Sequence, residues 1–290
     1  MNKRKTGFFF LAFIPVLLAQ AVQFFAIIFV YGVSAVTGVL SNLGAGSVRS
    51  SLNQIFYMFS DYNFSSFIMI IYSIIIICCF GLWYYTRLGG EFKPDFKNNF
   101  NMYKLLGIIL LVPGAQFLSS VIANITALIM PSWMQSYEEL FESAGFESDI
   151  TIVLFLYSVI FAPVCEELIF RGVTMNLAKT AVPFWAANLL QAFLFGAYHL
   201  NWIQGIYAFA LGLMLGYVCE RCGKIYYSIA FHMMFNFWGT VVSGLLPDEV
   251  SWIIWALLLI GMILSLILGF LFIHKGCKRN PSRINEAIQI

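Results

Sequence analysis

Residues 251–273 read SWIIWALLLIGMILSLILGFLFI, an apolar stretch without a charged side chain. A helix needs roughly 20 apolar residues to cross the hydrocarbon core of a bilayer, which is about 30 Å thick. The stretch therefore predicts a membrane-spanning helix. The whole chain has the same character, since 61% of its 290 residues are hydrophobic and only 10% are charged, whereas soluble domains carry about 25% charged residues. This composition excludes a water-soluble domain, so the lipid bilayer is the first partner we expect.

Seven more apolar stretches predict an all-α, multi-pass transmembrane helical bundle of about eight spans, folded as one structural domain. The spans before the last lie near residues 8–32, 64–85, 105–130, 150–170, 182–200, 203–219 and 226–246. They divide the chain into an N-terminal part (1–149) with three spans and an acidic external loop, a core of four spans (150–246), and a last span with a basic tail (247–290). We find no internal repeat, which disfavours a transporter built from duplicated halves.

Lysine and arginine residues lie almost entirely on one side of the predicted bundle. Short cytoplasmic loops of membrane proteins hold an excess of these residues. If the N-terminus is inside, Arg49 is the only external residue among the 16 Lys and Arg residues, and Arg171 counts as cytoplasmic. Both termini are therefore predicted to be cytoplasmic. The net charge of only +2 gives no basic face for a nucleic-acid partner.

The start of the chain fits a second interpretation, a secretory signal peptide. It has a basic beginning, an apolar stretch and the small-residue pattern Ala19-Gln20-Ala21, which are the three parts of such a peptide. Its removal would leave the other seven spans oriented as before. The short spans and Lys-rich loops are typical of a bacterial protein, so we expect a multi-pass protein of the plasma membrane.

Ionisable side chains inside a membrane span are costly, at about 2.5–3.5 kcal/mol for Asp, Lys or Arg at the centre of a helix. Each one is therefore a candidate for function. Together with one amide they are confined to three predicted spans. The fourth carries Glu166 and Glu167, followed by Arg171, the fifth ends in His199, and the seventh carries His232 and Asn236.

The spacing along the fourth span separates the roles of its two acids. Residues four apart share a helix face, whereas adjacent residues point about 100° apart. Glu167 and Arg171 are predicted to form an ion pair, while Glu166 faces a cavity without a permanent counter-charge and can act as a general base toward water. Pro163 lacks a backbone donor, so we expect it to kink the helix and free the carbonyl of Val159.

The other two helices of this group repeat the pattern. The fifth span has a polar and aromatic stripe at spacings of three, four and four, formed by Asn188, Gln191, Phe195 and His199. On the seventh span, His232 and Asn236 are four apart and point into the same space. Small residues that let helix backbones approach closely recur on the sixth span at Ala208, Gly212 and Gly216.

Two kinds of catalytic site fit these residues. In the first, a carboxylate removes a proton from water, and imidazole or amide donors stabilise the oxyanion that forms when a peptide bond is attacked. In the second, a Zn²⁺ ion is held by two imidazoles and a carboxylate, which makes Glu166, His199 and His232 the metal-ligand candidates. The HExxH signature of soluble zinc proteases is absent. The cofactor is therefore left open between none and Zn²⁺.

The same residues resemble the three motifs of the CPBP family of intramembrane proteases, which includes the type II CAAX prenyl endopeptidases and the Abi or bacteriocin-processing proteins. The EExxxR motif stands at Glu166–Arg171, FxxxH at Phe195–His199, and HxxxN at His232–Asn236. The motifs occur in this order on three separate hydrophobic stretches, and they cover about 75 residues, from Pro163 to Asn236.

The resemblance implies a role for each motif residue. It makes Glu166 the base, His199 its water-positioning partner, and His232 with Asn236 the groups that stabilise the oxyanion. Glu167 and Arg171 are implied to be a supporting pair, with Phe195 beside them. The candidate catalytic residues are thus Glu166, Glu167, His199, His232 and Asn236. Members of the family are named both metalloproteases and glutamate proteases, so the resemblance does not decide the cofactor.

We therefore expect a hydrolase, an intramembrane endopeptidase that cleaves a membrane-anchored protein or peptide. The resemblance implies CAAX-box protein maturation as one setting, while the bacterial character of the spans and loops favours maturation of a peptide pheromone or bacteriocin, or self-immunity. Two other classes stay open. One is a membrane adaptor or immunity protein that retains the motifs without catalysis, and the other is a proton-coupled carrier that uses the buried Glu and His residues as a relay.

Overall fold

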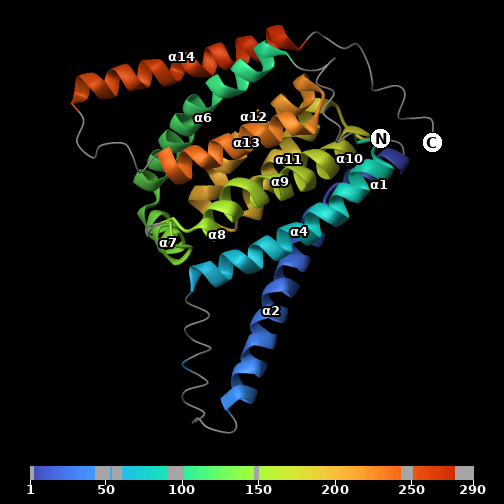
Figure 1. The fold of residues 1–290 in the computed structure, drawn as a ribbon. Coiled ribbons are helices and arrows are strands. Elements are labelled where there is room, and N and C mark those ends of the chain that lie inside the picture. The colour runs from blue at the N-terminus through green and yellow to red at the C-terminus, as the bar shows by residue number, and fades with distance from the viewer. Residues whose placement is uncertain are drawn as a thin grey trace.

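The computed structural model describes residues 3–42, 53, 61–90, 101–146, 150–242 and 251–277. Over these residues the chain is helical without a β-strand, which confirms the predicted all-α fold (Figure 1). The N-terminal part contains α1 (Lys3–Leu11), α2 (Ile14–Asn42), α4 (Tyr62–Arg87), α6 (Met102–Ile129) and α7 (Pro131–Ser143). Arg49, residues 147–149 and 243–250, and the basic tail from 278 onward lie outside the described residues.

The C-terminal part begins with one continuous helix that contains two π-helical stretches. Its segments are α8 (Ile152–Phe155), η1 (Leu156–Phe161), α9 (Ala162–Glu167), η2 (Leu168–Thr174) and α10 (Met175–Lys179). The remaining helices are α11 (Phe184–Tyr198), α12 (Trp202–Cys222), α13 (Ile225–Phe237) continuing into η3 (Trp238–Val242), and α14 (Trp252–Gly276).

Six helices in the described part of the chain are long and apolar enough to cross a membrane. They correspond to the predicted first, second, third, fourth, sixth and eighth spans. The predicted fifth span is α11, whose 15 residues extend about 22 Å at 1.5 Å per residue, less than the thickness of the hydrocarbon core. The multi-pass bundle is confirmed, and the count of eight spans stays a prediction.

Several helices begin where the sequence provides a side-chain cap. Asp61, Asn101 and Asn201 have extended backbones, and their side chains accept hydrogen bonds from backbone N–H groups in the first turns of α4, α6 and α12. These caps satisfy donors that have no partner within the helix. Helix α7, which lies within the predicted acidic loop, instead begins at Pro131.

The most extensive contacts between helices join α6 with α14 and α11 with α12. Glycines allow the second pair to approach. A Cβ atom added at Gly216 would come within 1.9 Å of the Asn188 side-chain oxygen, and one at Gly212 within 3.0 Å of the Ala192 backbone. The predicted small-residue stripe on α12 therefore packs directly against α11.

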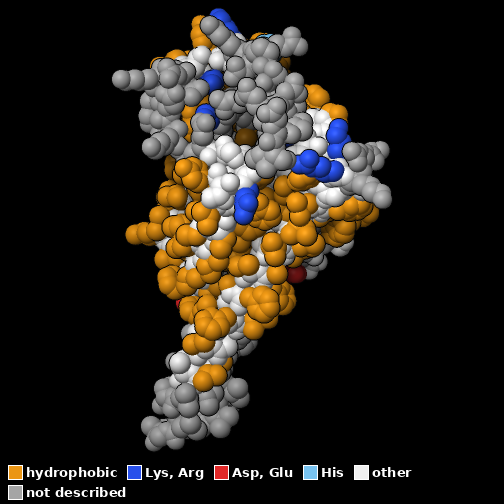
Figure 2. Space-filling view, turned by 90° about the vertical axis from the view of Figure 1, so that its right-hand side faces the viewer, with side chains coloured by type: hydrophobic (Ala, Val, Ile, Leu, Met, Phe, Trp, Pro, Cys, Tyr) orange, Lys and Arg blue, Asp and Glu red, His pale blue; other side chains and the backbone are white. Residues whose placement is uncertain are grey.

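Basic helix ends gather at one end of the bundle, where α1 contacts α10 and the start of α6 meets the ends of α12 and α14. The Lys104 amine donates to the Cys222 carbonyl (3.3 Å), and the Asn101 amide donates to the Gly276 carbonyl (3.0 Å). Figure 2, which faces this end, shows Lys and Arg side chains in its upper half and hydrophobic side chains below. The described chain thus begins and ends at the same basic end. Its assignment to the cytoplasm stays a prediction.

Arg171 is an exception to the predicted charge distribution. The charge count placed it in a cytoplasmic segment, but it lies inside the long helix and its side chain is fully buried. The helix runs on to Lys179, about two turns beyond the predicted end of the span near residue 170. Arg171 therefore belongs to the interior of the bundle and says nothing about orientation.

Candidate active site

The two acids lie midway along the helix from Ile152 to Lys179, at the end of α9 and between the π-helical stretches η1 and η2. π-helical turns are rare and occur frequently at functional sites. In this register a backbone N–H bonds to the carbonyl five residues earlier, and the N–H of Ala162 indeed donates to the Tyr157 carbonyl. The helix is thus locally widened just before the acids.

The π register changes the effect of Pro163. The carbonyl five residues before it belongs to Ser158, one residue before the predicted Val159. The Asn236 side-chain amide donates to the Ser158 carbonyl over 2.8 Å. A side chain from α13 therefore takes the place of the backbone donor that proline lacks, and it ties the third motif to the first.

Glu167 forms the predicted ion pair with Arg171. Its Oε1 lies 2.9 Å from Arg171 Nη1, and both side chains are fully buried. Arg171 Nη2 donates to the Gly212 carbonyl on α12 over 3.1 Å. His232 adds a contact that spacing did not predict, because its Nδ1 lies 3.0 Å from the same Glu167 oxygen. Glu167 is thus held by groups from its own helix and from α13.

Glu166 lies on the other side of His232. The distance from Glu166 Oε2 to His232 Nε2 is 3.6 Å, too long for a direct hydrogen bond. The Glu166 side chain is 15% exposed, whereas Glu167 is fully buried. Among the described residues Glu166 forms no ion pair with Arg or Lys. It is therefore the carboxylate that can receive a water molecule.

His199 lies just past the end of α11, where the chain turns into α12. Its Nδ1 is 2.9 Å from the Phe195 carbonyl. A carbonyl only accepts hydrogen bonds, so Nδ1 carries the proton and Nε2 of the neutral ring is an acceptor. His199 also interacts electrostatically with Glu166. The ring therefore has one nitrogen that can accept a hydrogen bond.

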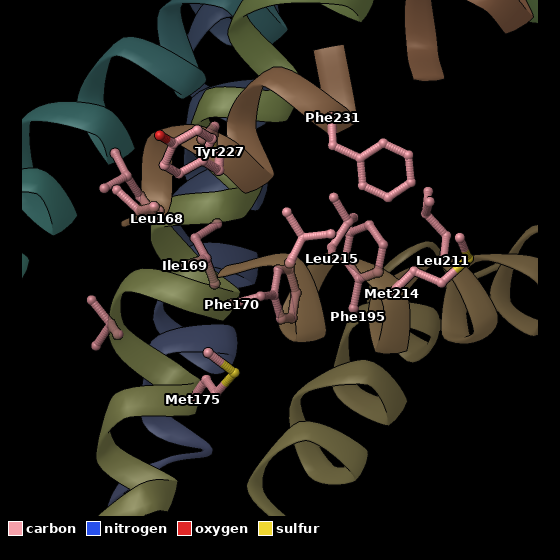
Figure 3. Close-up of a cluster of buried hydrophobic side chains, with 14 of the residues drawn as sticks. Leu168, Ile169, Phe170, Met175, Phe195, Leu211, Met214, Leu215, Tyr227 and Phe231 are labelled. Atoms are coloured by element: carbon pink, nitrogen blue, oxygen red, sulfur yellow. The ribbon is translucent and has the colours of Figure 1, made fainter. Parts of the chain in front are cut away.

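Phe195 is in contact with the charged and imidazole side chains of the site. Its ring centroid is 5.0 Å from that of His199 and 5.8 Å from that of His232. The Arg171 guanidinium carbon lies 4.6 Å from the ring centroid. Phe195 belongs to the hydrophobic cluster of Figure 3, where it lies beside Phe170, with ring centroids 5.1 Å apart. An apolar wall therefore supports the polar groups from one side.

The predicted stripe on α11 divides into two parts. Asn188 and Gln191 are fully buried and donate to α12 backbone carbonyls, those of Leu213 and Gly212, over 3.1 and 2.9 Å. These amides join α11 to α12. Phe195 and His199, further along the stripe, form the part that contacts the other motifs.

Uncharged polar residues on α2, α4 and α6, which the sequence analysis did not single out, also contact the site. Gln116 on α6 donates to the Phe235 carbonyl over 2.5 Å. On α2 and α4, Gln20 and Tyr72 contact Tyr198, which precedes His199. The signal that could have identified the glutamines is an amide side chain within an otherwise apolar span.

Glu166, His199 and His232 are the predicted metal ligands. A catalytic zinc ion takes three protein ligands. In the part of the chain that the structure describes, no three His, Cys, Asp or Glu side chains are grouped so that they could hold an ion. The cofactor stays a prediction, either none or Zn²⁺.

Comparison with known proteins agrees with the motifs. Residues 148–238 match the family described as type II CAAX prenyl endopeptidase Rce1-like. The match covers the helices from α8 to α13 and confirms the predicted resemblance. No curated protein and no solved structure matches the chain. The match indicates a membrane protease of the CAAX endopeptidase type.

Proposed function

We propose that this chain, whose residues 148–238 match the Rce1-like endopeptidases, is an intramembrane endopeptidase in which Glu166 activates the attacking water. One observation carries this proposal. Of two adjacent acids midway along a membrane helix, Glu167 is held by Arg171 and His232, while Glu166 is partly exposed and 3.6 Å from His232 Nε2. A carboxylate so placed is available for proton transfer.

The reaction begins when Glu166 takes a proton from a water molecule that also donates a hydrogen bond to His199 Nε2. The water oxygen forms a bond to the carbonyl carbon of the substrate peptide, and the carbonyl oxygen becomes an oxyanion. Glu166 then gives its proton to the amide nitrogen. The C–N bond breaks, and a carboxylic acid and an amine are released.

His232 and Asn236 are the donors proposed for the oxyanion. The Glu167 carboxylate accepts from His232 Nδ1, so Nε2 can donate to an oxyanion only when the ring carries both protons. Asn236 uses one amide hydrogen on Ser158, and its second amide hydrogen stays available. Preorganised donors of this kind are worth about 10²–10³-fold in kcat.

The proposed substrate is a protein or peptide held at the membrane, because the acids lie midway along a helix long enough to span it. A protein of the bacterial plasma membrane could use this activity to mature CAAX-like proteins, peptide pheromones or bacteriocins, or in self-immunity. Assays on each kind of peptide would separate these settings.

The test is cleavage of a membrane-anchored fluorogenic peptide by purified protein in liposomes. Glu166→Gln is expected to lower kcat by about 10²–10⁴-fold, the usual contribution of a general base. Glu220→Gln is the matched control, because Glu220 forms a partly exposed ion pair with Lys179 away from the site. Equal activity of wild type and Glu166→Gln would contradict the proposal, and retained protection of cells by an inactive variant would indicate an immunity protein.

A further inference from the structure

The end of α11 carries His199, and its backbone is held from outside the region that matches the protease family. A helix leaves its last four carbonyls without partners in the helix. In α11 the carbonyl of Phe195 accepts from the His199 ring, that of Gly196 from the His199 N–H, and that of Ala197 from the Leu200 N–H. The fourth carbonyl belongs to Tyr198.

Gln20 on α2 satisfies this fourth carbonyl. Its side-chain Nε2 donates to the Tyr198 oxygen over 3.0 Å. An unsatisfied carbonyl away from water is costly in a membrane. Breaking the hydrogen bond from Gln20 would therefore cost free energy, which keeps the amide in place. The bond fixes the peptide group between Tyr198 and His199 relative to α2.

The Tyr198 side chain is held from α4 as well. Its hydroxyl lies 2.5 Å from the Tyr72 hydroxyl and 3.4 Å from the Gln23 side-chain oxygen. Two helices of the N-terminal part therefore hold both the carbonyl and the hydroxyl of the residue before His199.

The turn after His199 needs such support. Leu200 has φ +54°, in the left-handed region that a leucine adopts only where its surroundings enforce it. The Leu200 side chain is 84% exposed and does not anchor the turn itself. The contacts at Tyr198 therefore help to fix the chain where it leaves α11, together with the Asn201 cap of α12.

We propose that Gln20 and Tyr72 are positioning residues that act through Tyr198 to hold the His199 ring toward Glu166. This inference rests on the proposed function, in which His199 orients the water molecule that Glu166 activates. It also gives the N-terminal helices a part in the site, although the family match begins only at residue 148.

The kinetic test uses Gln20→Met, which removes the amide and keeps the length of the side chain. We expect kcat on the membrane-anchored peptide to fall about tenfold with KM unchanged, because small displacements of a catalytic group cost rate. In a His199→Ala background the same substitution should not lower the single-turnover rate further. An equal fall in both backgrounds would overturn the proposal.

Tyr31→Phe is the matched control for Tyr72→Phe. Tyr31 joins α2 to α4 through its hydroxyl, 3.0 Å from that of Ser65, and it lies 11 residues beyond Gln20 on α2, about 16 Å along the helix. Tyr72→Phe should lower kcat and Tyr31→Phe should not. An equal effect of both substitutions on kcat would mean that Tyr72 contributes only to packing.

A double-mutant cycle of Tyr72→Phe and Tyr198→Phe, measured by thermal unfolding, tests the contact between these two hydroxyls without any substrate. The melting temperature of the double variant should fall by less than the sum of the two single falls, because both substitutions remove the same Tyr72–Tyr198 bond. If the wild type cleaves no peptide but this coupling is present, the proposed function fails and the contact stands. Additive shifts in melting temperature would show that the contact does not form.

Discussion

Arg171 is fully buried inside the bundle, and its guanidinium donates to Glu167 and to the Gly212 carbonyl. Removing one partner of a buried ion pair leaves the other charge buried and uncompensated, which typically costs about 3–5 kcal/mol. We therefore expect Arg171→Met to lower the free energy of unfolding by about this amount, measured by denaturation in detergent.

Lys179→Met provides the comparison at the other ion pair. The Lys179 and Glu220 side chains are 23% and 26% exposed, and exposed pairs contribute about 0–1 kcal/mol. A loss for Arg171→Met no larger than that for Lys179→Met would mean that Glu167 finds another partner when the guanidinium is removed.

At the residue scale, spacing along one helix was enough to predict the Glu167–Arg171 pair. It could not predict that His232 lies between the two acids, because that contact depends on how α13 packs against α9. Gln20 shows the same limit. An amide in an apolar span signals a partner in the protein, but the partner, 178 residues away, is fixed only by the tertiary fold.

At the element scale, the helix that carries Glu166 and Glu167 has a side-chain hydrogen bond in place of the backbone hydrogen bond that Pro163 cannot form. Asn236 donates to the Ser158 carbonyl, which lies opposite Pro163 in the π register. An unpaired buried acceptor costs about 1–3 kcal/mol, so Asn236→Ala should destabilise the protein by this amount. In a Pro163→Ala background the restored N–H offers the helix a donor of its own, and Asn236→Ala should cost at least about 1 kcal/mol less.

Thermal or denaturant unfolding of the four proteins in this cycle measures the coupling without reference to activity. Equal losses for Asn236→Ala in the two backgrounds would show that Pro163 and the amide act independently. An Asn236 that served only the oxyanion would give this result.

The apolar stretch predicted that this helix exists, but it did not predict which turns of the helix are α-helical and which are π-helical. A proline within a span predicts a freed carbonyl, and the residue that carries it depends on whether the turn before is α or π. The turn is π-helical, so the carbonyl without a backbone donor is that of Ser158 and not that of Val159. The Asn236 amide, which donates to this carbonyl, is a tertiary contact that the sequence of the helix does not reveal.

At the scale of the whole molecule, the helices that carry the three sequence motifs pack against helices from the rest of the chain. The family match ends at residue 238, and α6, which lies outside it, packs against α12, α13 and α14. Hydropathy predicted the apolar helices and the motifs predicted the site helices. How α2, α4 and α6 surround them could not be predicted, because lipid-facing and protein-facing apolar residues look alike in a sequence.

The orientation of the protein in the membrane is set by the distribution of Lys and Arg between its two sides. Arg87 ends α4 and is exposed, whereas Glu138 is exposed on the acidic helix α7. Since Lys and Arg are retained in the cytoplasm, Glu138→Cys should react with a membrane-impermeant maleimide in intact cells, and Arg87→Cys only after permeabilisation. The wild type, labelled in parallel, gives the background from native cysteines. The reverse pattern would turn the bundle over and would place the basic helix ends, with the start of α1 and the end of α14, outside the cell.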